Sequence, residues 1–493
     1  MYRLILYYLI GLVLVSVIYS SFHLLAFNPV NIILSSLFLV FFSGFVNDLL
    51  AVIFDAPTNS ESVYITALIL ALIITPVKTI ADFVFLAFAA MLAMASKYIL
   101  AVNKKHLFNP AAMAVVLTAF FLKQSASWWV GSLSLLPYVV IGGLLVARKT
   151  QKEEMILTFV LSAAVTLAGF AIIKGSSPLG ALTTMFLNSS LFFFAFVMLT
   201  EPLTMPNTFW RQMIFAVIVG YLFVPNVNLF GVYSTPELAL VVGNFFAYIV
   251  NPKTKLVLKL QSKIALTPDT YDFIFPLQNK INFVPGQYME WTLAHRGVDG
   301  RGNRRYFTLA SSPTENNLRI GVKFYQPASS YKKQMLSMNE TTPIVASQIA
   351  GDFTLPVDKN KKIAFIAGGI GITPYRSMIK YLIDKGERRN IILFYSNKDR
   401  SEIVYQDVFN EAQSKLGIKT VYTLTDINQI PADWIGKKGR VNEEMIRTEI
   451  PDFMERTFYL SGPRRMVVGF EQTLKAMNVK DENIKIDFFP GFV

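Results

Sequence analysis

Cysteine is absent from this 493-residue sequence, and histidine is nearly so. Without thiolates the chain has no disulfide bond, no cysteine nucleophile and no cysteine-held iron–sulfur cluster. Its three histidines are His23, His106 and His295. They cannot supply the axial ligands of two bis-histidine haems within a membrane, which argues against a transmembrane haem reductase of the ferric-reductase or NADPH-oxidase type. We also predict no metal site.

Charged residues are scarce in the first half of the chain. Residues 1–252 hold 11 of the 46 Lys and Arg residues and 8 of the 33 Asp and Glu residues. This unequal distribution predicts an apolar membrane domain over residues 1–252, followed by soluble domains. The net charge of +13 lies in part in juxtamembrane loops, and no basic run interleaved with aromatic residues indicates a nucleic-acid partner.

Apolar runs in the first half predict a polytopic α-helical domain with about ten spans in the lipid bilayer. We expect the spans near residues 4–22, 30–47, 63–76, 79–97, 110–122, 128–147, 154–173, 179–200, 209–224 and 236–251. No small-residue cleavage site follows the first run, so we interpret it as a span instead of a signal peptide. If both ends of this domain lie inside, eleven Lys and Arg residues lie at inner ends, counting Lys253, Lys255 and Lys259 directly after the last span, and three lie outside. The sequence therefore predicts a multi-pass protein of the cell (inner) membrane whose C-terminal domains are cytoplasmic.

Three segments of this half place proline or polar residues at the ends of spans. They read SVYITALILALIITP at 62–76, KKHLFNPAA at 104–112 and TEPLT at 200–204. Such ends are typical of discontinuous helices whose exposed backbone dipoles line a site. The simpler interpretation is that Pro110 and Pro202 only mark the ends of spans, and the residues alone leave both open.

In this order and spacing the three segments resemble the membrane subunit shared by two redox complexes. These are the D subunit of the Rnf electron-transport complex and the B subunit of the sodium-translocating NADH:quinone reductase, and the resemblance covers about residues 30–251. It implies flavin in this domain, for which we assign Asn109 and Thr204 as binding residues. In that family FMN is attached to a threonine of a Ser/Thr-Gly-Ala-Thr motif after the Asn-Pro-Ala-Ala span. The corresponding loop here, KQSASWW at 123–129, lacks Gly-Ala-Thr, so we expect a second flavin (FMN or riboflavin) to be held non-covalently.

The soluble half begins with short strand-like segments over residues 253–358. They read LVLKLQSKIAL, YDFIFPL, QYMEWTL, RYFTLAS, LRIGVKFY, PIVASQI and DFTLP. Six or seven short strands separated by turn residues predict a small antiparallel β-barrel.

Two motifs in this predicted barrel suit a dinucleotide flavin. In RRYFTLASSP (304–313), the guanidinium of Arg305 can bind a pyrophosphate, the hydroxyl of Thr308 can reach a polar ring edge, and the aromatic ring of Phe307 can pack on a π face. In ASSYKK (328–333), hydroxyls and N–H groups open a helix beside two lysines, which suits a pyrophosphate. Each motif alone also occurs in ordinary strands and solvated helix starts.

Residues 359–493 alternate strands with helices, which predicts a parallel, doubly wound α/β domain with its ligand at the carboxyl ends of the strands. The segment KKIAFIAGGIGITP enters a helix through a glycine turn. Its glycines would let a phosphate approach the backbone closely, with a threonine available for hydrogen bonding. It is not the dinucleotide fingerprint G-x-G-x-x-G, so this turn alone is a weak signal.

The series RYFTLASSP, SSYKK, AGGIGITP, YSNK, YLSGP and a terminal aromatic run resembles the ferredoxin–NADP reductase superfamily over residues 256–493. That resemblance implies an FAD-binding barrel at 253–358 and an NAD(P)-binding domain at 359–493. By position it assigns as cofactor-binding Arg305, Tyr306, Phe307, Thr308, Ser329, Ser330, Lys332, Gly368, Gly369, Gly371, Thr373, Pro374, Ser396, Gly462, Pro463, Phe488 and Phe489. It implies catalytic roles for Thr308, Ser461 and Asp487. Ser461 stands where many members have cysteine, so no thiol assists the transfer.

We therefore predict an NAD(P)H-dependent flavoprotein oxidoreductase that receives a hydride on FAD. Electrons would then pass singly through the membrane domain to quinone or to an acceptor across the membrane, with further redox subunits as partners. NADH is marginally preferred to NADPH, because the basic residues Lys398 and Arg400 after the second strand also suit a solvated turn. The remaining rival is a non-redox transporter with a regulatory flavin domain, which would transport its substrate without NAD(P)H.

Overall fold

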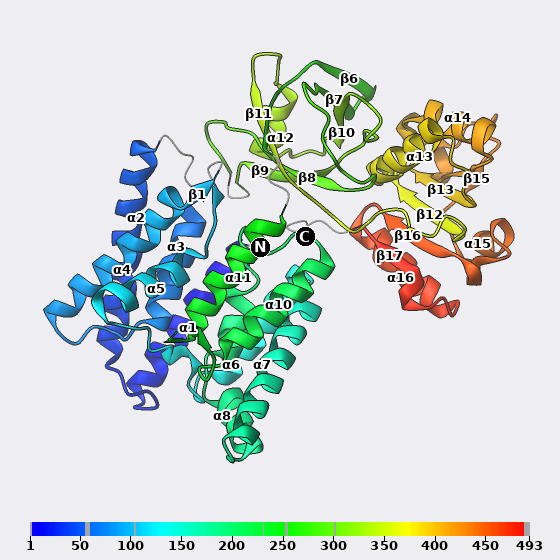
Figure 1. Ribbon diagram of the computed structural model, residues 1–493. Coiled ribbons are helices and arrows are strands. Elements are labelled where there is room, and N and C mark those ends of the chain that lie inside the picture. Colours follow the sequence, from blue (N-terminus) through cyan, green and yellow to red (C-terminus); the bar gives the residue numbers. More distant parts are fainter. Residues whose placement is uncertain are drawn as a thin grey trace. The chain divides into compact units, whose positions relative to one another are not determined.

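The computed structural model describes residues 2–54, 60–102, 105–229, 231–251, 255–299 and 302–487 (Figure 1). The chain divides into two compact units, Met1–Asn251 and Pro252–Val493. The predicted flavin-contacting residues Phe488 and Phe489 lie outside the described residues.

The first unit is helical. Its elements are α1 (Tyr2–Ser21), α2 (Pro29–Ile53), α3 (Ser60–Ile73), α4 (Ile80–Ile99), α5 (Pro110–Leu122), α6 (Leu136–Thr150), α7 (Glu153–Ile173), α8 (Pro178–Leu187), α9 (Leu191–Phe193), α10 (Phe209–Phe223) and α11 (Pro236–Val250). Short strand pairs join β1 (Ala101–Val102) to β2 (Lys105–His106) and β3 (Asn228–Leu229) to β4 (Val232–Tyr233). Each range that the sequence predicts as a span overlaps at least one of these helices.

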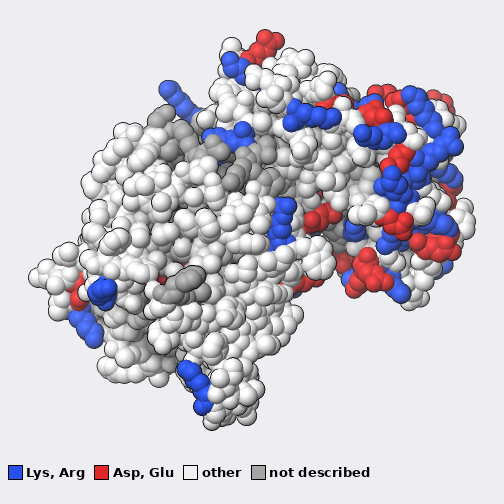
Figure 2. All heavy atoms as spheres, in the orientation of Figure 1, with Lys and Arg blue, Asp and Glu red and all other residues white. Residues whose placement is uncertain are grey.

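Several of these helices are long and apolar enough to cross a membrane. Among the described residues four pass by length and composition, and a fifth does if the bent pair Pro178–Leu187 and Leu191–Met198 counts as one span. Four further apolar helices are shorter, at Glu61–Ile73, Pro110–Leu122, Phe209–Phe223 and Pro236–Val250. Many large apolar side chains of this unit are exposed, and Figure 2 shows few charges on its visible surface. These features fit helices that contact lipid, while the number of spans stays a prediction.

One predicted span differs in shape from the continuous helix expected over 179–200. Helix α8 ends at Leu187, and the next helical stretch is bent by 60° from it. That stretch continues as a π-helix over Phe194–Met198, a form that is rare and concentrates at functional sites. The break falls at the polar residues 188–190 (NSS), which interrupt the apolar run without a Pro.

The second unit begins with two antiparallel sheets that form the predicted barrel. One has the strand order β10 (Asn317–Lys323), β7 (Thr270–Pro276), β6 (Ser262–Thr267), and the other has β5 (Lys255–Lys259), β11 (Pro343–Ala350), β8 (Tyr288–Thr292), β9 (Arg304–Thr308). Alternate residues of β10 are buried, as expected when one face of a strand meets the core. A short helix, α12 (Ser330–Leu336), follows β10.

Two details of the barrel differ from the sequence prediction. The run LVLKLQSKIAL is split into β5 and β6, which belong to different sheets. The segment DFTLP at 352–356 is not a strand. It follows Gly351, whose φ of 112° is incompatible with an extended L-residue, and Pro356 lacks the N–H that a sheet needs.

The rest of the second unit is a six-stranded parallel sheet. Its order is β15 (Lys437–Lys438), β14 (Lys419–Leu424), β13 (Ile391–Asn397), β12 (Ile363–Gly368), β16 (Thr457–Ser461), β17 (Ile484–Ile486). Helices α13 (Thr373–Lys385) and α14 (Gln406–Leu416) share one buried core with the sheet, and α15 (Glu443–Glu449) and α16 (Arg464–Ala476) share another (Figure 1). The chain leaves β12 towards β13 and returns on its other side as β16. This reversal is a topological switch point, where open α/β sheets bind ligands.

Candidate functional site

The carboxyl ends of β12 and β16 meet at the switch point. A Cβ atom added to Gly371 would lie 2.5 Å from the carbonyl oxygen of Ser461 and 2.6 Å from Cα of Gly462. One added to Gly368 would lie 2.3 Å from Sδ of Met466 and 3.2 Å from Cδ of Pro463. A side chain at Gly371 would collide with the backbone of the loop after β16, so only glycine fits there. At Gly368 the side chain of Met466, in α16, would have to move. Both glycines of the turn therefore allow close packing against the segment that follows β16.

Gly369 has a different role in the same turn. Its φ of 51° lies in the left-handed region, and a Cβ added there would meet nothing within 4 Å. The backbone here borders open space, as a backbone that a phosphate approaches must do. Helix α13 begins directly afterwards with Thr373 and Pro374, so its positive end points to this opening. Ser396 pairs with Gly368 across the ladder and lies at the same edge.

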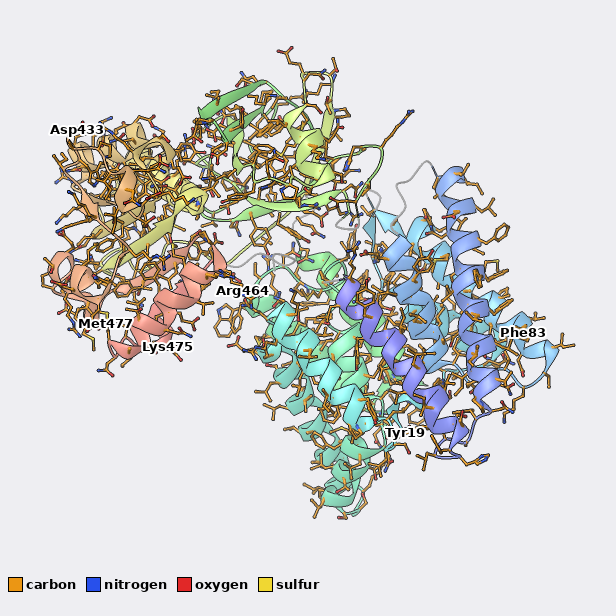
Figure 3. The ribbon with its side chains drawn as sticks, turned by 180° about the vertical axis from the view of Figure 1, so that it is seen from behind. Tyr19, Phe83, Asp433, Arg464, Lys475 and Met477 are labelled. Atoms are coloured by element: carbon orange, nitrogen blue, oxygen red, sulfur yellow. The ribbon has the colours of Figure 1, made fainter. Side chains whose placement is uncertain are left out.

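Ser461 and Asp487 form a hydrogen-bonded pair at this edge. The Ser461 hydroxyl donates to Oδ2 of Asp487 at 2.8 Å, and the Asp487 amide donates to the Leu460 carbonyl at 2.9 Å. Burial raises the pKa of Asp487 to about 7, against the opposing effect of the Ser461 bond. Helix α16 begins at Arg464, directly after this loop (Figure 3). The predicted residues Ser461, Gly462, Pro463 and Asp487 are thus next to the predicted glycine turn.

Two side chains of the predicted flavin-binding strand β9 pack against Tyr331, an aromatic residue that no sequence motif singled out. Tyr331 is fully buried; the guanidinium carbon of Arg305 lies 5.0 Å from its ring centroid and the ring of Phe307 6.2 Å. Arg305 donates to the carbonyl oxygens of Gly302 at 3.1 Å and Arg304 at 2.6 Å. Its guanidinium is therefore fixed in orientation before any ligand binds.

The hydroxyls at the start of α12 are already engaged by the protein. Ser329 accepts from the Lys332 amide at 3.3 Å, which caps the helix. The Ser330 hydroxyl accepts from the Asp299 amide at 2.9 Å and lies 3.0 Å from Nε2 of His295. The Nζ atom of Lys332 donates to the Lys323 carbonyl at 2.5 Å. These hydrogen bonds therefore stabilise the segment itself, since they join its side chains to other groups of the protein.

An open hollow of about 540 Å³ lies beside this segment. Its lining includes Arg296 and Lys333, together with His295, Asp299 and Ser330. The volume is in the range of small-molecule sites, and two cationic side chains favour an anionic group. Lys333 faces this space while Lys332 bonds elsewhere, a difference that sequence spacing could not reveal.

Tyr288 completes the barrel side of the site. It lies opposite Thr308 in the β8–β9 ladder, and its ring centroid lies 5.6 Å from that of Tyr306. Burial, followed by the charges of Asp352 and Asp487, raises the pKa of Tyr288 above its ordinary value. Its hydroxyl is therefore a neutral donor near a carboxyl group throughout the physiological range.

The first unit contains a polar cluster at two helix ends. Oε1 of Glu201 lies 3.1 Å from Nε2 of His106, and its Oε2 accepts from Asn109 at 2.9 Å and Thr204 at 3.2 Å. Asn244 joins the same two segments by accepting from the Asn109 amide at 2.8 Å and donating to the Thr204 carbonyl at 3.0 Å. The structure thus brings Asn109 and Thr204 together, as partners of a carboxylate that stood in the sequence motif TEPLT.

Known proteins resemble the second half of the chain. The family model described as "Oxidoreductase NAD-binding domain" matches residues 365–472. A flavohemoprotein of Bacillus cereus is 29% identical over 219 residues, which are 42% of this chain and 53% of that protein. The reductase subunit of a glycine betaine monooxygenase of Pseudomonas aeruginosa is 27% identical over 205 residues, 40% of this chain and 54% of that one. A solved structure of Amycolatopsis cytochrome P450 reductase aligns at 21% identity with a TM-score of 0.44, over 49% of this chain and 72% of that one.

The chain spans about half the length of the curated relatives it matches, 53% and 54%. These relatives are NAD(P)H-dependent flavoprotein oxidoreductases of the ferredoxin reductase family. The prediction of a ferredoxin reductase-type FAD- and NAD-binding module in the second half is therefore confirmed.

Proposed function

We propose that this protein is a membrane-bound flavin oxidoreductase that moves electrons from NAD(P)H in the cytoplasm into its own membrane domain. Quinone, or an acceptor across the membrane, would receive them. The observation that carries the proposal is the meeting of the Gly369 turn with the Ser461–Asp487 pair at the switch point of the sheet. A glycine turn that suits a phosphate thus lies beside a protonatable pair, in the unit that also holds the antiparallel barrel.

The residues of the second unit fit both cofactors. The N-terminal end of α13 and the open space at Gly369 suit the pyrophosphate of NAD(P)H. Arg305 and the cationic hollow at Arg296 and Lys333 suit the pyrophosphate and nucleotide half of FAD. When bound, FAD supplies the conversion of a two-electron hydride into single electrons.

The protein contributes positioning and proton control. The hydroxyl of Ser461 donates to the Asp487 carboxyl, which fixes the orientation of this side chain. Ser461 would lie beside the nicotinamide, and as a serine it brings no thiol to the transfer. Asp487 has a pKa near 7, so it can hold or release a proton under working conditions. On the barrel side, Tyr288 lies close enough to Asp487 to feel its charge, and because its pKa is raised it keeps its proton.

Support for NADH over NADPH comes from the turn after β13. An additional ribose phosphate would need a free basic group, and Arg400 is paired with Asp433 at 2.8 Å. The amide of Lys398 donates to Glu402 at 3.2 Å, which adds a carboxylate to the same turn. We therefore keep NADH as the preferred donor.

The first unit would carry the electrons onward. Its resemblance to a flavin-bearing membrane subunit supports a second, non-covalent flavin, FMN or riboflavin, near the cluster of Asn109, Thr204 and Glu201. Buried ionisable groups in an apolar helical unit are expected to be functional. The same resemblance supports an inner-membrane location, cytoplasmic C-terminal domains and further redox subunits as partners.

The proposal is tested with the full chain in lipid nanodiscs that contain a membrane quinone. We expect NADH oxidation to be coupled to quinone reduction. If NADH is oxidised with a soluble acceptor but not with quinone, the reductase activity of the second unit is still supported. The proposed route of electrons through the membrane unit is then refuted. Substrate transport that proceeds without NAD(P)H would instead support the rival transporter.

A further inference from the structure

Helix α13 is tied to the FAD-type barrel by buried polar bonds on the turn after its first residues. We propose that Arg376 and Ser377 are positioning residues for hydride transfer. They fix the NAD(P)H-binding turn against the chain segment that follows the flavin-binding strand, and so set the distance between nicotinamide and flavin. This inference rests on the proposed function of the second unit.

The bonds join α13 to the segment directly after β9. Nη1 of Arg376 donates to the Ala310 carbonyl at 2.7 Å, and the Ser377 hydroxyl donates to the Ser311 carbonyl at 2.7 Å. Arg376 also binds Glu315 with both terminal nitrogens, at 2.6 and 2.9 Å. Glu315 in turn accepts from the Ser312 amide at 2.7 Å. The guanidinium is 4% exposed and Ser377 is fully buried, so water does not compete for these bonds.

Both ends of this link lie next to expected cofactor contacts. Ala310 follows the predicted flavin residue Thr308 by two positions, and Arg376 follows the predicted NAD(P)H residue Thr373 by three. Because the link is so close to both sets of residues, any shift of α13 would change the distance between the glycine turn and β9. The link is short because it uses backbone carbonyls, which cannot rotate away as side chains do.

A steric contact supports the link from β10, which is hydrogen-bonded to Ala310 and Ser311 through Arg319. Gly321 of β10 packs against the nucleotide turn so closely that an added Cβ would lie 3.0 Å from Cγ2 of Thr373 and 2.5 Å from Oη of Tyr405. Tyr405 donates a hydrogen bond to Asp272, which also accepts from Arg319 of β10 at 2.8 Å. The turn is thus pressed onto the barrel at the same time as α13 is bonded to it.

The bonding pattern favours geometry over net stability. Buried ion pairs contribute little compared with apolar residues of the same size, since desolvation offsets the attraction. A guanidinium that binds a carboxylate with two parallel bonds nevertheless allows one orientation. Hydride transfer depends steeply on placement, and a shift of about 1 Å costs on the order of 100-fold in rate. Arg376 is therefore expected to affect the reaction more than its contribution to stability suggests.

The chain offers a closely matched control. Arg456 is also 4% exposed, binds Asp452 with Nε at 2.7 Å and Nη2 at 3.1 Å, and donates to the Ile363 carbonyl at 3.0 Å. Its bonds lie at the amino end of β12, the opposite end of the strand from the glycine turn. Loss of bidentate binding at Arg456 should disturb the domain to a similar degree without moving the turn.

The test compares Arg376→Lys, Ser377→Ala and Arg456→Lys in the full-length protein. Flavin content, the dissociation constant of NADH, the rate constant of flavin reduction at saturating NADH, and the isotope effect with NADH deuterated at the transferred position are measured. We expect Arg376→Lys to lower the rate constant by about 10-fold to 100-fold, with flavin content unchanged and the isotope effect increased. Ser377→Ala should lower it less, and Arg456→Lys should leave it within about 2-fold of the wild type.

Each result decides between the alternatives. A wild-type rate in both Arg376→Lys and Ser377→Ala would overturn the inference, as would an equal loss in Arg456→Lys. If Arg376→Lys fails to fold, Ser377→Ala and Gly321→Ala decide, because a single hydroxyl or methyl group perturbs the same link from its two sides. Wild-type protein that holds flavin but is not reduced by NADH would refute the proposed function itself, an outcome distinct from equal rates among reducible variants.

Discussion

At the scale of single residues, the account depends on groups whose protonation and orientation the fold fixes. Asp487 is the clearest case. It is a carboxyl group whose pKa burial raises to about 7 from an ordinary value of 3.8, beside a serine that donates to it. A neutral acid at this edge can donate or accept a proton near physiological pH.

Replacement of Asp487 by Asn should change how stability depends on pH. Between pH about 4 and about 7 the native protein holds a proton that the unfolded chain has released, so the contribution of Asp487 is fully present below pH about 4 and is lost as the pH rises to 7. Asn cannot titrate. The melting temperature of Asp487→Asn relative to the wild type should therefore rise across this window and level off above it. A difference that stays constant with pH would show that Asp487 has its ordinary pKa in the folded protein.

Arg305 is the residue whose loss should remove FAD most directly. Its guanidinium is fixed by the carbonyl groups of Gly302 and Arg304 and packs on Tyr331. A charge-assisted bond to phosphate is worth roughly 1.5–3 kcal/mol, so Arg305→Leu should weaken FAD binding by about 10-fold to 100-fold. Equilibrium dialysis of the purified variant measures this directly. Unchanged affinity would assign the pyrophosphate to the hollow at Arg296 and Lys333 instead.

Sequence reasoning found the residues that carry a motif and missed those that act through distant contacts. Arg305, Ser330, Gly371 and Ser461 each stand in a recognisable string. Tyr331 could have been found, because it is the aromatic residue between the two motif hydroxyls and the lysines. The prediction used its neighbour Ser330 instead. His295 could not be found, because its hydrogen bond to Ser330 spans 35 positions.

At the scale of elements, the turn between β12 and α13 is the critical structure. Its three glycines serve two purposes: Gly368 and Gly371 let two loops touch, whereas Gly369 adopts a left-handed conformation beside open space. The sequence predicted one purpose, close approach of a phosphate, for all three. The difference lies in contacts with the loop after β16, which strand order in the sheet determines.

Gly371→Ala tests that contact at a position that does not require a left-handed backbone. The added methyl group would lie 2.5 Å from the Ser461 carbonyl and must push the two loops apart. We expect weaker NADH binding with normal flavin content, measured by titration of flavin absorbance. Gly469→Ala in α16 is the matched control: nothing lies within 4 Å of its added methyl group, and Ala in a helix stabilises by about 0.5–1 kcal/mol. Equal NADH binding in Gly371→Ala and the wild type would show that the loops tolerate separation.

Element prediction succeeded where periodicity and burial agree. Residues 359–493 alternate strands with helices as predicted, among them the helix Glu443–Glu449 and the strand Thr457–Ser461. Prediction failed at DFTLP, where an alternating pattern follows a glycine with positive φ. It also failed over 179–200, where the polar residues 188–190 (NSS) stand at the 60° bend and were read as part of one continuous span.

At the scale of the whole molecule, two units with different surfaces share one chain. The first exposes apolar side chains and few charges, and the second carries most of the Lys, Arg, Asp and Glu residues (Figure 2). Composition alone predicted this division. The path of electrons between the units depends on cofactors and geometry that composition does not encode, which is why it enters as a proposal.

The most direct test of the central claim is an anaerobic titration of the purified full-length protein with NADH, followed by flavin absorbance. The account predicts that the protein releases FAD on acid treatment and that one equivalent of NADH bleaches one equivalent of FAD. Because electrons reach the second, non-covalent flavin as well, one further equivalent of NADH is needed to bleach it. The account also predicts that added quinone restores the absorbance, and that the denatured polypeptide carries no attached flavin. A protein that holds FAD but is not bleached by NADH would contradict the claim, because the meeting of the glycine turn with Ser461 and Asp487 would then serve no hydride transfer.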